Sequence, residues 1–190
     1  MKISTGKFKG RNIIVPSDIR PVSLKVRKSC FDILGDEISG RKVLDLFAGS
    51  GSLGIEALSR GASGAVFIEL KGKCTEAIAN NISSLYSEYD FGVYQKDVFT
   101  SIKDFWAKKE HFGVIFLDPP YYKGMLIKAL QLLEGYDILA PSGYVVGFCY
   151  EKDPFLEAAK KFSLILNRKY GQNRLLIYRK DEKSDLSRDI

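Results

Sequence analysis

The 190-residue chain has the composition of a single globular domain, because 45% of its residues are hydrophobic and 27% are charged. No apolar run approaches the roughly 20 residues that a membrane-spanning helix needs, and residues 1–10 lack the apolar core of a signal peptide. We therefore expect a cytoplasmic protein. The three cysteines form no CxxC pair, and a single histidine, His111, gives a metal site or a Ser-His-Asp hydrolase little to build on. We predict neither a disulfide framework nor a bound metal.

The positive charge is concentrated at the N-terminus. Residues 1–28 contain eight lysine and arginine residues and one acid, Asp18, so their net charge is +7, whereas the whole chain carries +6. The remaining residues therefore sum to −1. A basic segment beside a neutral body is typical of proteins that bind a polyanion such as nucleic acid, although a solvated charged face has the same composition.

The order of the predicted elements indicates an α/β fold. Residues 1–15 resemble a hairpin, and Ser23 begins a helix that ends by Gly40. Apolar strands then alternate with amphipathic helices, which predicts an open, mostly parallel sheet with helices on both faces. The predicted strands are 42–47, 64–70, 91–96, 112–118, 143–150 and two strands around 170–173; the predicted helices are 52–60, 73–86, 102–108, 126–133 and 154–161.

A glycine-rich loop follows the first predicted strand. Gly49, Gly51 and Gly54 have the GxGxxG spacing, which lets a ligand approach the backbone at a helix N-terminus but is weak evidence for any one cofactor. Asp45 lies just before this loop. Because a carboxylate repels the pyrophosphate of a dinucleotide, Asp45 favours a ligand with a cationic part, such as the ammonium and sulfonium of S-adenosylmethionine.

Acids mark the ends of four successive predicted strands. Asp45 belongs to the first, and Glu69 ends the second, where it can bind both hydroxyls of a ribose. Asp97 follows the third, where it can accept from an adenine amino group, and Asp118 ends the fourth. A single acid of this kind is ordinarily a solvated loop residue. Four at corresponding positions beside a glycine loop predict one binding site at the carboxyl edge of the sheet.

The sequence DPPY at residues 118–121 predicts a site for an aromatic amine. The prolines end the strand, which frees the carbonyl of Pro119 from the sheet, so this carbonyl and the Asp118 carboxylate can accept both hydrogens of one NH2 group. The nitrogen can then become tetrahedral as it attacks a methyl group, and the Tyr121 ring can stack on the base. A simple turn after a strand is the alternative interpretation. The inferred reaction is direct methyl transfer from a sulfonium to an exocyclic amine.

These motifs resemble those of class I S-adenosylmethionine-dependent amino-methyltransferases, and more narrowly those of the RsmD family, which methylates guanine N2 in bacterial 16S ribosomal RNA. The similarity covers about residues 2–179 and includes GKFKGRNI, RPVSLKVRKSCFDIL, LDLFAGSGSLGIEALSRGA, FLDPPYYKG and YGQNRLLIYR. It implies a Rossmann-like class I methyltransferase fold with a mostly parallel seven-stranded sheet, helices on both faces, and an N-terminal β-hairpin and helix. It also implies a basic hairpin extension (1–22), a methyltransferase domain (23–180) and a polar tail (181–190).

The resemblance further implies roles for individual residues. The acceptor site would comprise Asp118, Pro119 and Tyr121. S-adenosylmethionine would be bound by residues of the glycine loop and the strand ends: Asp45, Phe47, Gly49, Gly51, Glu69, Leu70, Asp97 and Val98. Arg20 and Arg27 would line the RNA side. The basic character of the N-terminal segment adds Lys7, Lys9 and Arg11 as predicted contacts to the substrate RNA.

The chain departs from the family pattern at Val22, where the family usually has threonine, and in the fifth predicted strand, which lacks the family's glutamate. The expected partner is 16S ribosomal RNA within a 30S subunit or an assembly intermediate. Because DPPY can hold either guanine N2 or adenine N6, the nearest alternative is a DNA or other RNA amino-methyltransferase. More distant alternatives are a nicotinamide-dependent oxidoreductase and a non-catalytic RNA-binding module.

Overall fold

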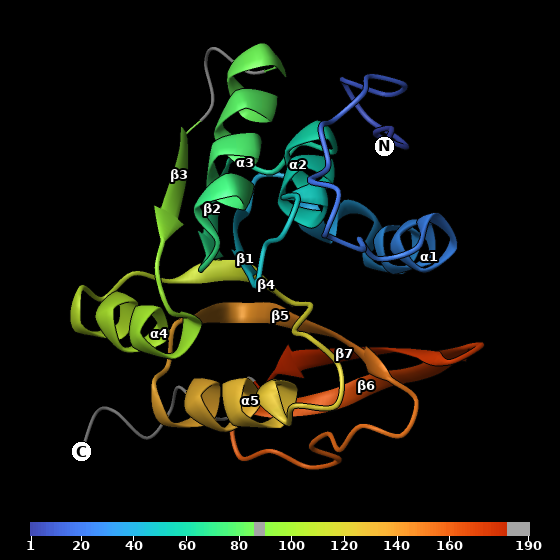
Figure 1. Ribbon diagram of the computed structural model, residues 1–190. Coiled ribbons are helices and arrows are strands. Elements are labelled where there is room, and N and C mark those ends of the chain that lie inside the picture. Colours follow the sequence, from blue (N-terminus) through green and yellow to red (C-terminus); the bar gives the residue numbers. More distant parts are fainter. Residues whose placement is uncertain (86–89, 182–190) are drawn as a thin grey trace. The chain divides into compact units, whose positions relative to one another are not determined.

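The computed structural model describes residues 1–85 and 90–181, which belong to two compact units (Figure 1). Unit 1 comprises Met1–Val98 and unit 2 comprises Phe99–Ile190. All seven predicted strands are present among the described residues. The predicted polar tail lies outside the described residues from 182 onward. The division into an extension, a methyltransferase domain and a tail stays a prediction.

Unit 1 is built on three parallel strands with the order β3-β2-β1. Strands β1 and β2 are almost entirely buried, as expected for parallel strands that helices cover on both faces. Helix α2 packs against β1 and β2, and α3 packs against β2 and β3. The elements of this unit are α1 (Leu24–Leu34), the 3-10 helix η1 (Gly35–Ile38), β1 (Lys42–Leu46), α2 (Ser52–Ser59), β2 (Gly64–Glu69), α3 (Gly72–Leu85) and β3 (Asp90–Gln95).

The N-terminal part of unit 1 follows the sequence prediction with two differences. The α-helix predicted to run up to Gly40 ends at Leu34, and the 3-10 helix Gly35–Ile38 continues from it. Ser23 caps α1, since its hydroxyl accepts a hydrogen bond from the N–H of Val26 at 3.4 Å. The predicted hairpin is present, but a single antiparallel bridge between Lys2 and Asn12 joins its two arms in place of regular strands. Backbone hydrogen bonds such as Ile3 N–H to the Arg11 carbonyl (3.0 Å) complete it.

Unit 2 contains four strands with the order β4-β5-β7-β6. β4 and β5 are parallel, whereas β7 is antiparallel to both β5 and β6. β6 and β7 form a hairpin that turns at Gly171, whose φ is 61°. The elements are α4 (Val98–Ala107, which begins at the last residue of unit 1), β4 (Phe112–Leu117), α5 (Met125–Gly135), β5 (Leu139–Tyr150), β6 (Phe162–Tyr170) and β7 (Asn173–Lys180).

The predicted helix over residues 154–161 is wrong, because that segment contains no helix. Two contacts with β7 hold it in an irregular path. The hydroxyl of Tyr178 donates a hydrogen bond to the Leu156 carbonyl at 2.8 Å, and the Arg174 guanidinium lies 4.6 Å from the centroid of the Phe155 ring. These tertiary contacts outweigh a weak local preference for helix.

Candidate active site

The loop between β1 and α2 holds its backbone in the left-handed region at several positions. Gly49 and Gly51 have φ angles of 54° and 74°, and the non-glycine residue Phe47 has a φ of 63°. Left-handed backbone at a non-glycine residue costs on the order of 1–3 kcal/mol and is concentrated at functional sites. The strain at Phe47 therefore supports the prediction of a ligand-binding loop, and it is a signal that no sequence pattern contains.

Asp45 and Gly54 fix the first turn of α2 on the sheet. The Asp45 side chain is buried, and its Oδ2 accepts a hydrogen bond from the Gly54 N–H at 2.9 Å. A Cβ atom at Gly54 would lie only 2.3 Å from the ring of Phe67 on β2, so the third glycine of the motif permits close contact between helix and strand. The acid also places negative charge at the start of a helix, where the helix dipole favours it.

Glu69 joins the end of β2 to the glycine loop. Its Oε2 accepts from the Gly49 N–H at 2.8 Å, and its Oε1 accepts from the N–H groups of Leu70 and Lys71, each at 2.9 Å. A carboxylate offers about four acceptor positions, so these three bonds orient Glu69 and leave capacity for a ligand hydroxyl. The structure thus brings together two residues that the sequence analysis assigned to the same cofactor.

Asp97 is exposed at the end of the same parallel sheet. Because β1, β2 and β3 are parallel and aligned at their ends, Asp45, Glu69 and Asp97 lie along one edge of unit 1. Asp97 directly precedes α4, a position at which an acid also serves as a helix cap. Val98 begins that helix and is buried, whereas Leu70 is exposed.

Asp18 and Ile19 belong to the segment that precedes α1 and lie beside this site, and the sequence analysis gave neither of them a role in it. Asp18 forms ion pairs with Lys73 at 2.7 Å and with Lys71 at 3.1 Å. Hydrogen bonds from Lys73 and then Lys71 lower the pKa of Asp18 to about 2. The next residue, Ile19, places its Cγ2 atom 3.3 Å from where a Cβ of Gly49 would be, so any larger residue at Gly49 would press on this segment.

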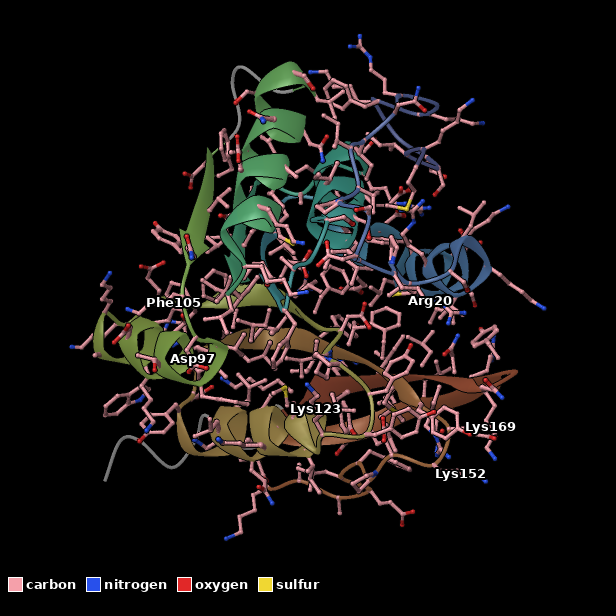
Figure 2. All side chains as sticks on the ribbon, in the orientation of Figure 1. Arg20, Asp97, Phe105, Lys123, Lys152 and Lys169 are labelled. Carbon is pink, nitrogen blue, oxygen red and sulfur yellow. The ribbon has the colours of Figure 1, made fainter. Side chains whose placement is uncertain are left out.

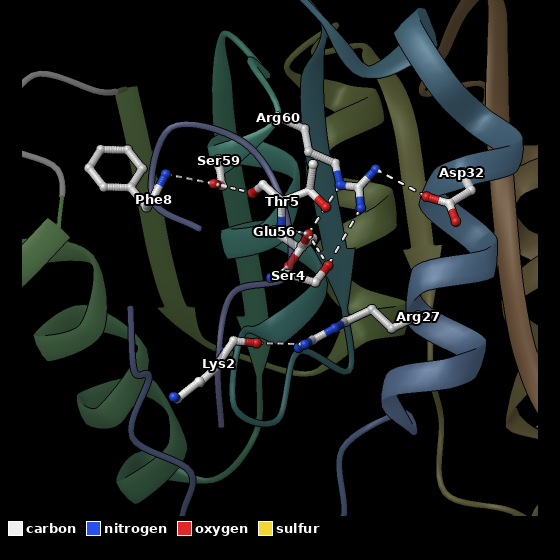
Figure 3. A network of polar contacts seen from close by, with 9 residues as sticks. All are labelled: Lys2, Ser4, Thr5, Phe8, Arg27, Asp32, Glu56, Ser59 and Arg60. Atoms are coloured by element: carbon white, nitrogen blue, oxygen red, sulfur yellow. Dashed lines mark hydrogen bonds and ion pairs between the residues drawn. The ribbon is translucent and has the colours of Figure 1, made fainter. Parts of the chain in front are cut away.

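Glu56 on α2 holds the N-terminal segment in place (Figure 3). Its side chain is only 1% exposed. Its carboxylate accepts hydrogen bonds from the N–H groups of Ser4 (2.8 Å) and Thr5 (3.1 Å) and from the Arg60 guanidinium (3.1 Å). The sequence analysis did not single out Glu56, although an acid within the buried helix SLGIEALS was a signal that could have found it.

Ser59 and Arg27 complete this polar network. Ser59 Oγ accepts from the Phe8 N–H at 3.0 Å and donates to the Thr5 carbonyl at 2.7 Å. The structure contradicts the prediction that Arg27 lines the RNA side, because Arg27 is fully buried and its guanidinium donates to the Lys2 carbonyl at 2.8 Å. Desolvation by this burial lowers the pKa of Arg27. Arg27 anchors the basic segment and does not present its own charge to a partner.

The other predicted RNA-binding residues have exposed side chains. These are Lys7, Lys9, Arg11 and Arg20. Arg20, labelled in Figure 2, belongs to the segment between the hairpin and α1. Their exposure satisfies a first requirement for contact with a polyanion, and their assignment to RNA stays a prediction.

In unit 2, β4 ends at Leu117 and Asp118 follows it directly, as the sequence predicted. Burial raises the pKa of Asp118 to about 7, because desolvation disfavours its charged form. Some of its surface nevertheless stays accessible, while Pro119 is buried. A carboxyl group in a poorly solvated position, on a residue that keeps some accessible surface, is suited to accept hydrogens from a ligand that supplies its own donors.

Tyr121 is held by a residue far along the chain. Its hydroxyl donates a hydrogen bond to Oδ1 of Asn173, at the start of β7, at 3.1 Å. This contact restrains the ring that the sequence analysis expected to stack on a base. The sequence analysis assigned neither Asn173 nor the neighbouring Tyr122, because their contacts depend on how β7 and the loop after β5 return to this point.

Neither a metal-binding cluster nor a membrane-spanning helix is present in residues 1–85 and 90–181. No group of three or more histidine, cysteine, aspartate or glutamate side chains is arranged to hold a metal ion. No helix in that part of the chain combines the length and apolar character needed to cross a membrane.

The chain is similar to known proteins over nearly its whole length. It matches the family model described as "Conserved hypothetical protein 95" over residues 1–179. It is 34% identical to "Putative rRNA methyltransferase YlbH" of Bacillus subtilis (strain 168), over 95% of this chain and 99% of that protein. It is 29% identical to "Ribosomal RNA small subunit methyltransferase D" of Escherichia coli (strain K12), over 100% of this chain and 94% of that protein.

Solved structures confirm the fold. The Escherichia coli protein titled "Putative methyltransferase yhhF" superimposes with a TM-score of 0.84 at 30% identity, covering 96% of this chain and 98% of that one. The Thermus thermophilus 16S rRNA N2 G1207 methyltransferase (RsmC) shares the fold at 20% identity, with a TM-score of 0.68 over 92% of this chain and 46% of that one. The predicted α/β, Rossmann-like class I methyltransferase fold is therefore confirmed. On the match over residues 1–179, the chain belongs to the family described as Conserved hypothetical protein 95, which is the RsmD family that its motifs resembled.

Proposed function

We propose that this chain transfers a methyl group from S-adenosylmethionine to the exocyclic N2 amine of a guanine in 16S ribosomal RNA. The observation that carries the proposal is Asp118, a partly accessible residue whose carboxyl group has a raised pKa; it stands directly after β4 and is followed by Pro119 and Tyr121. The names of the relatives support it, since one is named a putative rRNA methyltransferase and the other a ribosomal RNA small subunit methyltransferase.

The residues of unit 1 fit S-adenosylmethionine. Gly49 and Gly51 let a ligand approach the backbone without a Cβ in the way, and the buried Asp45 carboxylate suits the cationic end of the cofactor. Glu69 is oriented by three N–H groups and keeps acceptor capacity for the ribose, and Asp97 lies exposed at the end of the same sheet, where an adenine amine can reach it. When bound, the cofactor supplies an electrophilic methyl group on its sulfonium.

The residues of unit 2 fit the amine. Asp118 and the Pro119 carbonyl accept the two amine hydrogens, which lets the nitrogen lone pair leave conjugation with the ring. The amine gains a methyl group and loses one proton, and Asp118 is placed to receive that proton. With a pKa of about 7, this carboxyl group can both accept the proton and release it to water near neutral pH. Tyr121, restrained by Asn173, stacks on the base.

The experiment that tests the proposal is transfer of labelled methyl from S-adenosylmethionine to 30S particles that lack their native modifications, with nucleoside analysis of the product. N2-methylguanosine in 16S RNA is the expected product. N6-methyladenosine would retain the chemistry and reject the proposed base, because Asp118 and Pro119 can hold either amine. Absence of transfer to 30S particles, naked 16S RNA and DNA alike would contradict the proposal and favour a binding module.

A nicotinamide-dependent oxidoreductase is the main alternative of another class. The carboxylates of Asp45 and Glu69 both contact the glycine loop, where they would repel a pyrophosphate. We therefore expect S-adenosylhomocysteine, and not NADH, to raise the melting temperature. Stabilisation by NADH alone would contradict the assignment of the cofactor.

A further inference from the structure

Tyr122 has an unusual backbone and an unusual exposure for a large aromatic residue. It follows the DPPY motif, its φ is 62°, and its side chain is 71% exposed. A left-handed bulky residue persists only where its surroundings enforce it, and such strain is concentrated at functional sites. An exposed aromatic ring at such a backbone position does not stabilise the fold. A role in binding a partner is therefore the better explanation of this residue.

Asp153 enforces the position of Tyr122. The Asp153 carboxylate accepts hydrogen bonds from the N–H of Tyr122, at 3.1 Å from Oδ1, and from the N–H of Tyr150, at 3.1 Å from Oδ2. One side chain therefore ties the loop after β4 to the end of β5. Since both bonds are to backbone groups, they hold the loop in the same way whichever side chain stands at position 122.

Three tyrosine rings gather as a result. The Tyr122 ring centroid lies 4.7 Å from that of Tyr150, with the planes tilted by 51°, and 6.3 Å from that of Tyr121, in an edge-on arrangement of 84°. Tyr150 thus supports the Tyr122 ring from one side while most of the ring stays open to solvent. A supported, exposed aromatic ring beside the residue that stacks on the target base is a surface on which a second planar group can stack.

Exposed lysines beside these rings are suited to contact the phosphates of a nucleic acid. Lys123 follows Tyr122, and Lys152 lies in the turn between Tyr150 and Asp153; both side chains are exposed. Lys169, near the end of β6, pairs with Glu151 at 3.7 Å, and the Asp153 carboxylate is bonded to the backbone of the tyrosines, so these three lysines exceed the two acids by one charge. These three lysines come from three different segments of unit 2 (Figure 2). Aromatic rings interleaved with cations are the arrangement by which proteins bind single-stranded RNA.

We infer that Tyr122, supported by Tyr150 and positioned by Asp153, stacks on a nucleotide that flanks the target base, and so helps to select single-stranded RNA. This inference rests on the proposed function, and it adds a second base-binding ring to the one at Tyr121. The first part of the test replaces Tyr122 with asparagine, which removes the ring and tolerates left-handed backbone, and with phenylalanine, which keeps the ring. Tyr94, which is 52% exposed on β3, is replaced with asparagine as the matched control.

Methyl transfer and RNA binding are measured for the four proteins. With naked 16S RNA, Tyr122→Asn is expected to raise KM for RNA about ten-fold with kcat unchanged, because stacking contributes roughly 1–3 kcal/mol per base. Tyr122→Phe and Tyr94→Asn are expected to behave as wild type. The melting temperature of each protein is expected to stay the same, since the ring is exposed. A single-stranded oligonucleotide carrying 2-aminopurine beside the mapped guanine is expected to lose its quenching in Tyr122→Asn only.

The outcomes separate the inference from the function on which it rests. An unchanged KM and unchanged quenching in Tyr122→Asn, with active wild type, would overturn the inference alone. A defect on 30S particles that is absent on naked 16S RNA would also overturn it, in favour of contact with a ribosomal protein. If wild type binds RNA but transfers no methyl group, the proposed function fails; loss of oligonucleotide binding in Tyr122→Asn would then still support the stacking ring.

Discussion

Glu56 and Ser4 are joined by two hydrogen bonds although 52 residues separate them in the sequence: Ser4 donates from its N–H to Oε2 at 2.8 Å and from its hydroxyl to Oε1. Glu56 lies on α2, the helix whose N-cap is Gly51 of the glycine loop. The same short helix therefore carries the predicted cofactor loop at one end and anchors the basic hairpin along its length. Glu56 thus anchors the hairpin together with the buried side chains of Ile3 and Ile13 on its two arms.

We expect Glu56→Gln to destabilise the protein by about 2–4 kcal/mol, because an amide NH2 group would face donors that a carboxylate oxygen now accepts in a buried site. Affinity for RNA should fall with stability, while affinity for S-adenosylhomocysteine should change little. Urea denaturation and ligand titration measure these quantities.

Glu37→Gln is the matched control for Glu56. Glu37 pairs with Arg41 at 2.6 Å on an exposed part of the chain, so its replacement should change the free energy of unfolding by less than about 0.5 kcal/mol. Equal effects of the two substitutions would show that Glu56 does not organise the hairpin.

The positions of the strands and of the glycine loop were predictable because they follow from local pattern. Buried parallel strands read as apolar runs, and the helix cap at Ser23 and the strand end before Asp118 follow from single residue types. The local hydrogen bonds that orient Glu69 also arise from its own neighbours in sequence.

What could not be predicted depends on contacts between distant segments. The helix expected over residues 154–161 is replaced by an irregular path because Tyr178 and Arg174 of β7 bind it. Arg27 looks like any other base in a basic segment, and only the fold shows that it is buried against the N-terminal backbone. The contacts of Glu56 and Asp153 are of the same kind, since each carboxylate bonds backbone that no spacing rule connects to it.

Asp118→Asn should abolish most methyl transfer, with a loss of about 100- to 1,000-fold in kcat. The amide oxygen can accept a hydrogen bond from the amine, but it cannot take up the proton that the amine loses. Binding of S-adenosylhomocysteine should be retained. The exposed carboxylate of Asp36 is a suitable control, and Asp36→Asn should transfer methyl groups at the wild-type rate. Transfer by Asp118→Asn at near wild-type rate would contradict the proposed role of Asp118.

The raised pKa of Asp118 predicts a pH dependence with a definite sign. The ionised carboxylate is the acceptor, so kcat/KM should rise with pH and level off above the pKa of about 7. The free energy of unfolding should respond in the opposite direction. Because Asp118 holds its proton more tightly in the folded state than in the unfolded state, its contribution to the free energy of unfolding falls as pH rises from about 4 to 7. In Asp118→Asn the free energy of unfolding should therefore decline less between about pH 4 and 7 than in the wild type. Urea denaturation at several pH values would measure the difference.

Gly54→Ala should destabilise the protein by about 1–3 kcal/mol, because the added Cβ would lie 2.3 Å from the Phe67 ring in a packed interior. Gly135→Ala is the control: this glycine ends α5 and has open space around a Cβ, so alanine should be neutral or stabilising by up to about 1 kcal/mol. Thermal and urea unfolding compare the two. Equal stability of the two variants would show that α2 and β2 can separate without cost.

The exposed hairpin residues Lys7, Lys9 and Arg11 are predicted to contact RNA phosphates. Replacing all three with glutamine should weaken binding to 16S RNA and make the slope of log K against log salt shallower by about 2, since each lost contact to single-stranded RNA removes roughly 0.7 from it. Glutamine replacements of Lys103, Lys108 and Lys109, which are exposed on and after α4, remove the same charge elsewhere and should leave the slope nearly unchanged. An equal change in both triple variants would mean that net charge alone, and not the hairpin that Glu56 holds, determines RNA affinity.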